Sequence, residues 1–194
     1  MHLTSTVRVV MAVAITCLAG ATAAASTAVS LPPGTVITGT ASGATNGLLG
    51  LDSGFADVPG SGITVLDANE LEYLSRDYAV GIDFFADGLV VFYGNTDNGS
   101  LPGSYTFGFD FAALPGALNG FALLDLSALS GGTVVTSVLN AHAVSITLQD
   151  VVFNQPYATF TAQVSTVPEP APLVLLGGGL LGLWARRGLK GTSS

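Results

Sequence analysis

The feature that most constrains the fold is a strict alternation of residue types between positions 105 and 111. Aromatic residues alternate there with small or polar ones, in the order Tyr105, Thr106, Phe107, Gly108, Phe109, Asp110 and Phe111. Successive side chains of a β-strand point to opposite faces, whereas a helix repeats every 3.6 residues. The segment is therefore predicted to be a strand with one buried aromatic face.

Short runs of alternating or β-branched residues fill most of the chain between its two terminal segments. Tyr78–Phe85 and Leu89–Tyr93 are predicted to form a hairpin, because Ala86-Asp87-Gly88 supplies a glycine where a positive φ is needed. Further strands are predicted at Thr35–Thr40, Ile63–Leu66, Phe121–Leu126, Thr133–Leu139, Ala143–Gln149 and Tyr157–Val164. About nine short strands predict an all-β domain, an antiparallel β-sandwich or jelly roll.

Two segments fit this pattern less well. Ala41–Gly62 is rich in glycine and small residues and is expected to be a long surface loop. Asn69–Arg76 fits either a short helix or an alternating strand, and the sequence leaves that choice open. The whole region 26–167 is near the commonest domain size and is predicted to be one secreted β-sandwich domain.

Charge is unevenly distributed along the chain. Between Ser26 and Val167, Arg76 is the single basic residue, whereas twelve of the 13 acidic residues lie there. Such a surface repels phosphate groups and has no counterions to release from nucleic acid, so nucleic-acid binding is excluded as a function. Cationic partners and divalent metals remain compatible with this charge.

The N-terminus has the order of a secretory signal peptide. Residues 1–8 carry one arginine, Val9–Leu18 is almost entirely apolar, and 19–25 are small residues with cleavage expected after Ala23 or Ala25. Cys17, the only cysteine, would be removed with this segment. The exported domain is therefore expected to contain no disulfide, cysteine nucleophile or cysteine-based metal site.

The C-terminus combines an extended motif, an apolar run and a basic end. Val167-Pro168-Glu169-Pro170 begins it, residues 173–185 are uncharged, and Arg186-Arg187 follow directly. The prolines keep the motif extended, and we expect 173–185 to form a membrane helix whose end the arginines hold at the anionic cytoplasmic face. Four glycines in this run argue against a buried soluble helix, because each weakens such a helix by roughly 1 kcal/mol.

These residues, over 168–194 and the preceding Val167, resemble the PEP-CTERM sorting signal of exported proteins in Gram-negative bacteria that make exopolysaccharide. The resemblance implies two processing enzymes as partners, signal peptidase and a membrane-embedded exosortase. It also implies an intermediate anchored in the inner membrane, followed by transfer to the cell surface or extracellular matrix. Pro168, Glu169 and Pro170 would then be substrate residues of the exosortase.

Few residues of the middle region suggest catalysis. Glu70 and Glu72 could lie on one face of a strand as a carboxylate pair for glycoside hydrolysis, but solvated acids on an edge strand explain the same pattern and are preferred. His142, the only histidine outside the signal peptide, has no Gly-x-Ser-x-Gly motif to serve, and we expect it in a loop or on a sheet surface.

Calcium is the one metal for which the sequence offers several candidate ligands close together. Carboxylates and amides gather around the predicted hairpin, with Asp83, Asp87 and Asp97 as candidate ligands beside Asn95 and Asn98. The twelve-residue calcium-loop pattern does not fit when it is started at Asn95. Ordinary turn chemistry accounts for the same residues, so no cofactor is expected.

The sequence thus predicts an exported, non-enzymatic protein with a structural or adhesive role at the cell surface or in the exopolysaccharide matrix. Extracellular polysaccharide would be its partner. A carbohydrate-binding or calcium-stabilised module is the alternative, and a glycan-active hydrolase a further one.

Overall fold

The computed structural model describes residues 27–67 and 69–166, and the described chain is an all-β structure of two antiparallel sheets. The predicted signal peptide and the predicted sorting signal, including its helix, lie outside the described residues. Within the described residues, no helix is long and apolar enough to cross a membrane.

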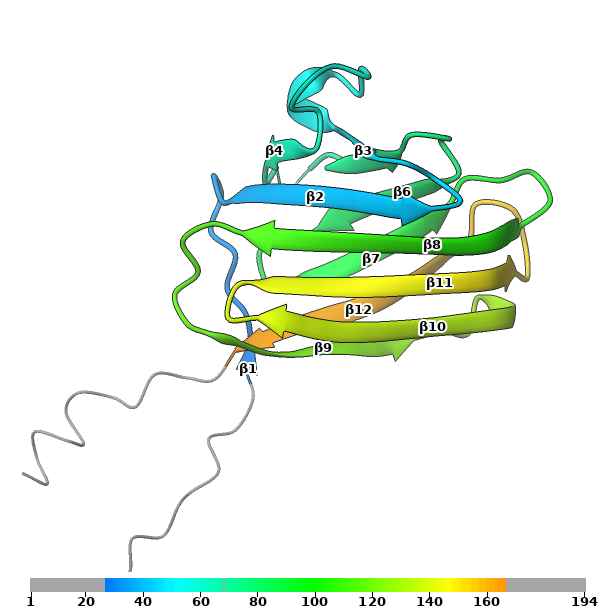
Figure 1. Cartoon of the computed structure of the whole chain (residues 1–194). Helices are drawn as coiled ribbons and strands as arrows, with labels where there is room; N and C mark the ends of the chain where they lie inside the picture. The colour runs from blue at the N-terminus through cyan, green and yellow to red at the C-terminus, as the bar shows by residue number, and fades with distance from the viewer. Residues whose placement is uncertain (1–26, 68, 167–194) are drawn as a thin grey trace, which may run out of the picture.

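The seven-stranded sheet has the order β1-β12-β7-β6-β5-β3, and β9 pairs with β12 beside this path. Its strands are β1 (Thr27–Ala28), β3 (Leu48–Gly50), β5 (Tyr73–Ser75), β6 (Val80–Phe84), β7 (Leu89–Gly94), β9 (Leu118–Asp125) and β12 (Thr159–Thr166). The five-stranded sheet has the order β10-β11-β8-β2-β4. Its strands are β2 (Val36–Gly43), β4 (Ile63–Val65), β8 (Ser100–Phe111), β10 (Leu129–Asn140) and β11 (Ala143–Phe153). Figure 1 shows the two sheets as layers, one behind the other.

The aromatic stripe predicted from the sequence is confirmed as the inner face of β8. Tyr105, Phe107, Phe109 and Phe111 are buried, whereas the residues between them are only half-buried. Phe109 meets Phe84 of the other sheet edge to face, with ring centroids 4.9 Å apart. Aromatic pairs in this arrangement contribute beyond the area they bury. The stripe of one sheet is therefore packed directly on the opposite sheet.

Tyr73 adds a polar link between the sheets within this core. Its ring lies 6.0 Å from that of Phe109, and its hydroxyl donates a hydrogen bond to the carbonyl oxygen of Ile37 in β2 at 2.6 Å. Tyr73 belongs to β5 of the seven-stranded sheet and Ile37 to the five-stranded one. Because this hydroxyl is satisfied, the phenol is buried without the cost of an unpaired polar group.

The predicted hairpin is confirmed as β6 and β7. The backbone N–H of Phe85 donates to Leu89 and that of Gly88 donates to Phe85, which closes the turn. Gly88 has φ +78°, a conformation that a side chain disfavours, and a Cβ atom there would meet Val29. The turn therefore requires the glycine that the sequence supplies.

The structure resolves or corrects the two unclear segments. Asn69–Arg76 contains the short strand β5 and no helix, because Tyr73 turns inward to the aromatic core. The prediction of one long surface loop at Ala41–Gly62 is wrong in part: β2 continues to Gly43, and β3 and a 3-10 turn, Leu51–Ser53, follow. Leu48 and Leu49 are buried despite their small neighbours, so burial rather than composition decides this segment.

We expect replacement of Phe84 by Ala to lower the free energy of unfolding by about 3–5 kcal/mol, because it removes a ring that contacts both sheets. Chemical denaturation measures this change. Phe85→Ala, at the half-buried neighbouring position, is the matched control and should cost clearly less. Equal losses in the two variants would contradict the role given to the aromatic core.

Candidate functional site

The two glutamates singled out from the sequence are separated by the fold. Glu70 is exposed in the segment before β5, whereas Glu72 is completely buried, with an exposed fraction of 0%. The prediction that both are solvated acids on an edge strand is therefore wrong for Glu72. β5 starts only at Tyr73 and is paired on both sides, with β3 and with β6. Glu72, directly before it, therefore adjoins an interior strand and not an edge strand.

The side-chain oxygens of Glu72 accept backbone hydrogen bonds that no neighbouring strand accepts. One oxygen accepts a hydrogen bond from the backbone N–H of Asp67 at 3.0 Å, and the other accepts from that of Phe84 at 2.7 Å. The Phe84 N–H lies just beyond the pairing of Tyr73 with Ile82, where β5 no longer supplies an acceptor. Glu72 thus ties the segment before β5 to the end of β6.

Glu72 faces a second acid across the strands. Extending the pairing of Tyr73 with Ile82 by one position places Glu72 opposite Asp83, and the two side chains share a hydrogen bond. Burial, and to a smaller extent the neighbouring Asp83, raise the pKa of Glu72 to about 8. Burial also raises the pKa of Asp83. Two like charges opposite each other would be destabilising, so at neutral pH the pair holds one proton, on Glu72.

Asp83 connects this buried pair to the surface. Its Oδ2 accepts a hydrogen bond from the Tyr93 hydroxyl at 3.3 Å, and burial raises the pKa of that phenol. Asp83 and Tyr93 line a pocket of about 400 Å³ on the outer face of the seven-stranded sheet. The residues around it are Leu71, Leu74, Gly81, Asp83, Tyr93, Asn95 and Tyr157. We refer to it as the tyrosine pocket.

The candidate calcium ligands do not come together. Asp83 is occupied by Glu72 and Tyr93, and Asp87 accepts the backbone N–H of Leu89 in the hairpin turn. Asp97 follows the other end of β7 and accepts the Tyr157 hydroxyl at 2.9 Å. Within the described residues, no three His, Cys, Asp or Glu side chains are grouped so that they could hold a metal ion.

Of the two asparagines of this region, Asn98 acts in a turn, as ordinary turn chemistry predicts, whereas Asn95 links two segments that are distant in the sequence. The side-chain oxygen of Asn98 accepts the backbone N–H of Ser100 at 3.0 Å. The amide of Asn95 donates to the backbone carbonyl of Tyr78 at 2.6 Å. Of the two, Asn95 also lines the tyrosine pocket.

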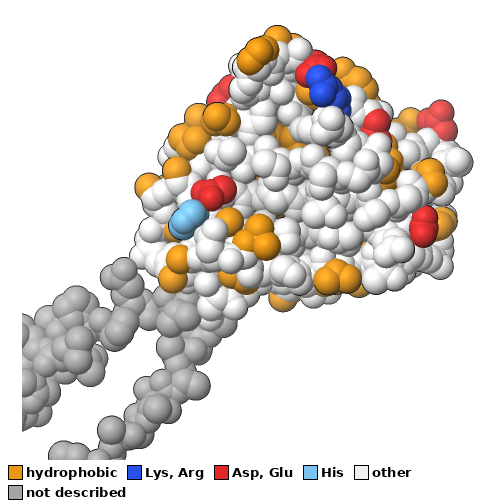
Figure 2. All heavy atoms as spheres, viewed as in Figure 1, with side chains coloured by type: hydrophobic (Ala, Val, Ile, Leu, Met, Phe, Trp, Pro, Cys, Tyr) orange, Lys and Arg blue, Asp and Glu red, His pale blue; other side chains and the backbone are white. Residues whose placement is uncertain are grey.

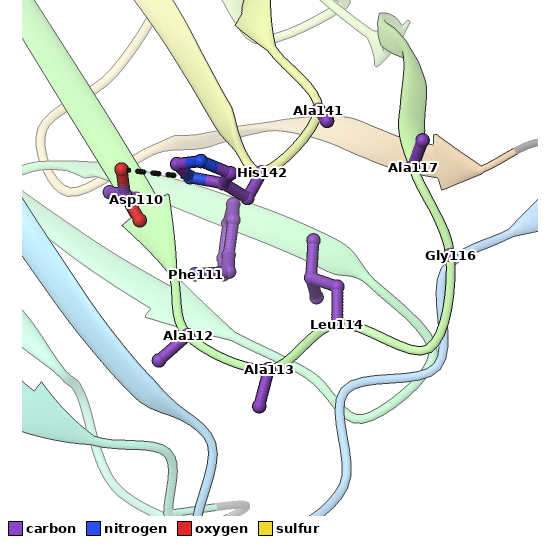
Figure 3. Close-up of a pocket in the computed structure, with 9 residues that line it drawn as sticks. All are labelled: Asp110, Phe111, Ala112, Ala113, Leu114, Gly116, Ala117, Ala141 and His142. Atoms are coloured by element: carbon purple, nitrogen blue, oxygen red, sulfur yellow. Dashed lines mark hydrogen bonds and ion pairs between the residues drawn. The ribbon is translucent and has the colours of Figure 1, made fainter.

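His142 lies at a second pocket, of about 520 Å³. It occupies the turn between β10 and β11, and its Nδ1 lies 3.0 Å from Oδ2 of Asp110 at the end of β8. Figure 3 shows this pair at the rim, with Phe111 and Leu114 on the inner side and the 112–117 loop around it. The prediction of a surface or loop histidine is confirmed, because His142 is exposed. Its carboxylate partner was not foreseen from the sequence.

The lining of the two pockets differs in the chemistry it offers. The Asp110–His142 pocket presents one imidazole and one carboxylate among alanines, glycine and two apolar side chains. The tyrosine pocket presents two phenols, a carboxylate and an amide beside leucines. That is the usual composition of a small-molecule site, an apolar and aromatic wall with a few polar groups that fix orientation.

Gly81, Tyr93 and Tyr157 were not predicted from the sequence as site residues. A signal for them existed, because Gly81 interrupts a run of apolar residues in β6 and leaves space on one face of the sheet. Which side chains would border that space depended on the register of β5, β7 and β12, which the sequence does not supply. The pairing of Glu72 with Asp83 could not be predicted either, because it too depends on strand register.

Comparison of the chain with protein-family models, with curated proteins and with solved structures found no match. The geometry of the described residues therefore carries the functional argument.

We expect the midpoint of thermal unfolding to fall as the pH rises from about 5 to about 8. The folded protein holds the Glu72 proton up to about pH 8, whereas an unfolded glutamate releases it near 4.3, so unfolding releases a proton in this range. In Glu72→Gln the decrease should be much smaller, even if this variant is less stable at every pH. Glu70→Gln, the exposed control, should keep the parent's dependence; identical slopes in all three proteins would refute the assignment.

Millimolar calcium is expected to leave the midpoint of thermal unfolding unchanged, because Asp83, Asp87 and Asp97 are held apart by the β6–β7 hairpin. Differential scanning calorimetry with calcium and with magnesium as the control tests this. A calcium-specific increase that Asp97→Asn abolishes would show that a site forms around Asp97.

Proposed function

We propose that the chain is an exported, non-enzymatic protein that acts as a structural or adhesive component of the cell surface or exopolysaccharide matrix. The observation that carries the proposal is the pairing of Thr27 with Thr166 in β1 and β12. The first and last described residues therefore leave the β-sandwich side by side, at one end of the molecule (Figure 1). A domain whose two ends lie together can be attached at that end, and its opposite end and its sheet faces then stay accessible to matrix components.

The predicted sorting signal begins directly after this pairing, at Val167-Pro168-Glu169-Pro170. On the proposal, an exosortase acts on the motif while the 173–185 helix holds the chain in the inner membrane. The product is then released to, or attached at, the cell surface. Tethering at one end of a rigid two-sheet domain fits a component that bridges the cell and its matrix.

The surface of the domain supports a role in a hydrated matrix. Figure 2 shows few charged side chains on the face it presents. Arg76, the one Lys or Arg among the described residues, is paired with Asp57. An acidic surface of this kind favours hydration and solubility over binding to anionic polymers.

The position of the carboxylates favours binding over glycoside hydrolysis. Hydrolases of this type need two carboxyl groups about 5–10 Å apart, both reaching the substrate. Glu72 is completely buried and hydrogen-bonded to Asp83, so it reaches no substrate, and Glu70 is not part of the pair. We therefore rank the adhesive role above the hydrolase.

Replacement of Pro168, Glu169 and Pro170 together by Ala tests the sorting step. We expect the variant to remain unprocessed in the membrane fraction, whereas the parent is found at the surface or in the matrix; fractionation and immunoblotting measure both. Pro102→Ala, an exposed proline of β8, is the control and should be processed like the parent. Normal processing and location of the triple variant would contradict the proposal.

A further inference from the structure

We propose that the tyrosine pocket binds a neutral sugar unit of a polysaccharide. This deepens the adhesive role proposed above and rests on it for its biological setting, while the binding itself can be measured independently of sorting.

The lining of the pocket includes Gly81, which belongs to a row of cross-strand neighbours. The register aligns Leu74, Gly81, Tyr93 and Thr159 across β5, β6, β7 and β12. Gly81 contributes no side chain to this row. A Cβ atom there would lie 3.3 Å from Cδ1 of Leu71 and 3.4 Å from Cβ of Tyr93, so a methyl group would press on these two side chains of the pocket wall and shift them.

Two tyrosines border this hollow. Tyr157 is 61% exposed and has φ +58°, a backbone conformation that is rare for a bulky residue. Its hydroxyl donates to Asp97, which holds the ring in place at the surface. Residues kept in such conformations concentrate at ligand sites, because binding uses the geometry they impose. The apolar faces of tyrosine rings can pack against the C–H faces of a sugar ring, while the hydroxyls keep their hydrogen bonds to Asp97 and Asp83.

The polar groups of the pocket suit hydroxyl ligands. Asp83 supplies a carboxylate that accepts hydrogen bonds, and Asn95 supplies an amide that both donates and accepts. The hydrogen bond from Asn95 to the carbonyl of Tyr78, at 2.6 Å, fixes the orientation of this amide. The hydrogen bonds of Asp83 with Glu72 and Tyr93 hold its carboxylate from two strands. Directed donors and acceptors beside an aromatic wall match a polyhydroxylated ring.

Charge selects neutral sugars over acidic ones. Asp83 lines the pocket and Asp97 lies at its edge through Tyr157, whereas no lysine or arginine lines it. Among the described residues, the one arginine, Arg76, is paired with Asp57. A uronate or sulfated sugar would meet like charge with no cationic partner, and its binding would be disfavoured.

The tyrosine pocket lies at the end of β12 that is far from the predicted membrane anchor. Tyr157 precedes the first residue of β12, and Thr166, where the described chain ends, is the last residue of that strand. Eight extended residues separate the two ends by roughly 25 Å. The Asp110–His142 pocket, in contrast, lies near Thr166, where the described chain ends, because Leu118 of β9 hydrogen-bonds to Ala141 and pairs with Thr166. A ligand in the tyrosine pocket is thus held away from the predicted anchor.

The test is titration of the full chain, purified in detergent micelles, with the neutral polysaccharides laminarin, galactomannan and dextran, and with alginate as the anionic probe. We expect at least one neutral polysaccharide to bind and alginate not to bind. Tyr157→Ala should weaken that binding by about tenfold, the effect of losing one stacked ring. Tyr157→Phe, which keeps the ring but loses the hydrogen bond to Asp97, should weaken binding clearly less than Tyr157→Ala. Gly81→Ala should bind more weakly because its methyl group shifts Leu71 and Tyr93 in the pocket wall.

His142→Ala is the matched control at the other pocket and should leave binding unchanged. The unfolding midpoint of each variant, measured by circular dichroism, separates lost binding from lost folding; Gly81→Ala provides the answer if Tyr157→Ala does not fold. No binding to any neutral probe, equal binding to alginate, or a loss seen only in His142→Ala would overturn the assignment. Such a result with normal sorting of the parent would leave the surface role standing, whereas failed sorting with intact binding would remove only that role.

Discussion

The structure depends on one contact region, where Phe84 and Tyr73 of the seven-stranded sheet meet Phe109 and Phe111 of the five-stranded sheet. Face-to-face packing of two sheets is the way in which an antiparallel structure buries one side of each sheet. The Tyr73 hydroxyl adds direction to this packing, because its hydrogen bond to Ile37 specifies which part of β2 lies over β5. A disulfide is not needed for this link, since the aromatic core already joins the layers.

The same packing accounts for the buried carboxyl pair. Tyr73 must point inward to reach the core, so its neighbour Glu72 points to the other side of the sheet, where β6 presents Asp83. An acid in that position cannot stay ionised beside another acid, and the raised pKa of Glu72 follows from burial and this neighbour. The pair in turn holds Asp83 at the tyrosine pocket. Core packing and surface chemistry are thus coupled through two adjacent residues, Glu72 just before β5 and Tyr73 at its start.

In a β-sandwich whose first and last residues lie side by side, the loops at the opposite end and the sheet faces are available for recognition. In this chain, the Asp110–His142 pocket lies near Thr166, where the described chain ends, and the tyrosine pocket lies at the other end of β12. The proposed adhesive role needs contact away from the anchor, which only the second position provides. The acidic domain, with its one paired arginine, limits the partners that fit such a surface to neutral or cationic ones.

The sequence by itself determined the fold class, the β6–β7 hairpin and the aromatic face of β8. All three follow from local rules, the period of two along a strand and the need for glycine in a tight turn. The export and sorting segments are likewise a property of the sequence, and they stay predictions. Only the tertiary structure decided that Glu72 is buried, that Leu48 and Leu49 lie inside, and that Asp110 meets His142. These outcomes depend on which strands become neighbours and in which register, and the free energy that selects the register comes from packing between residues far apart in the chain.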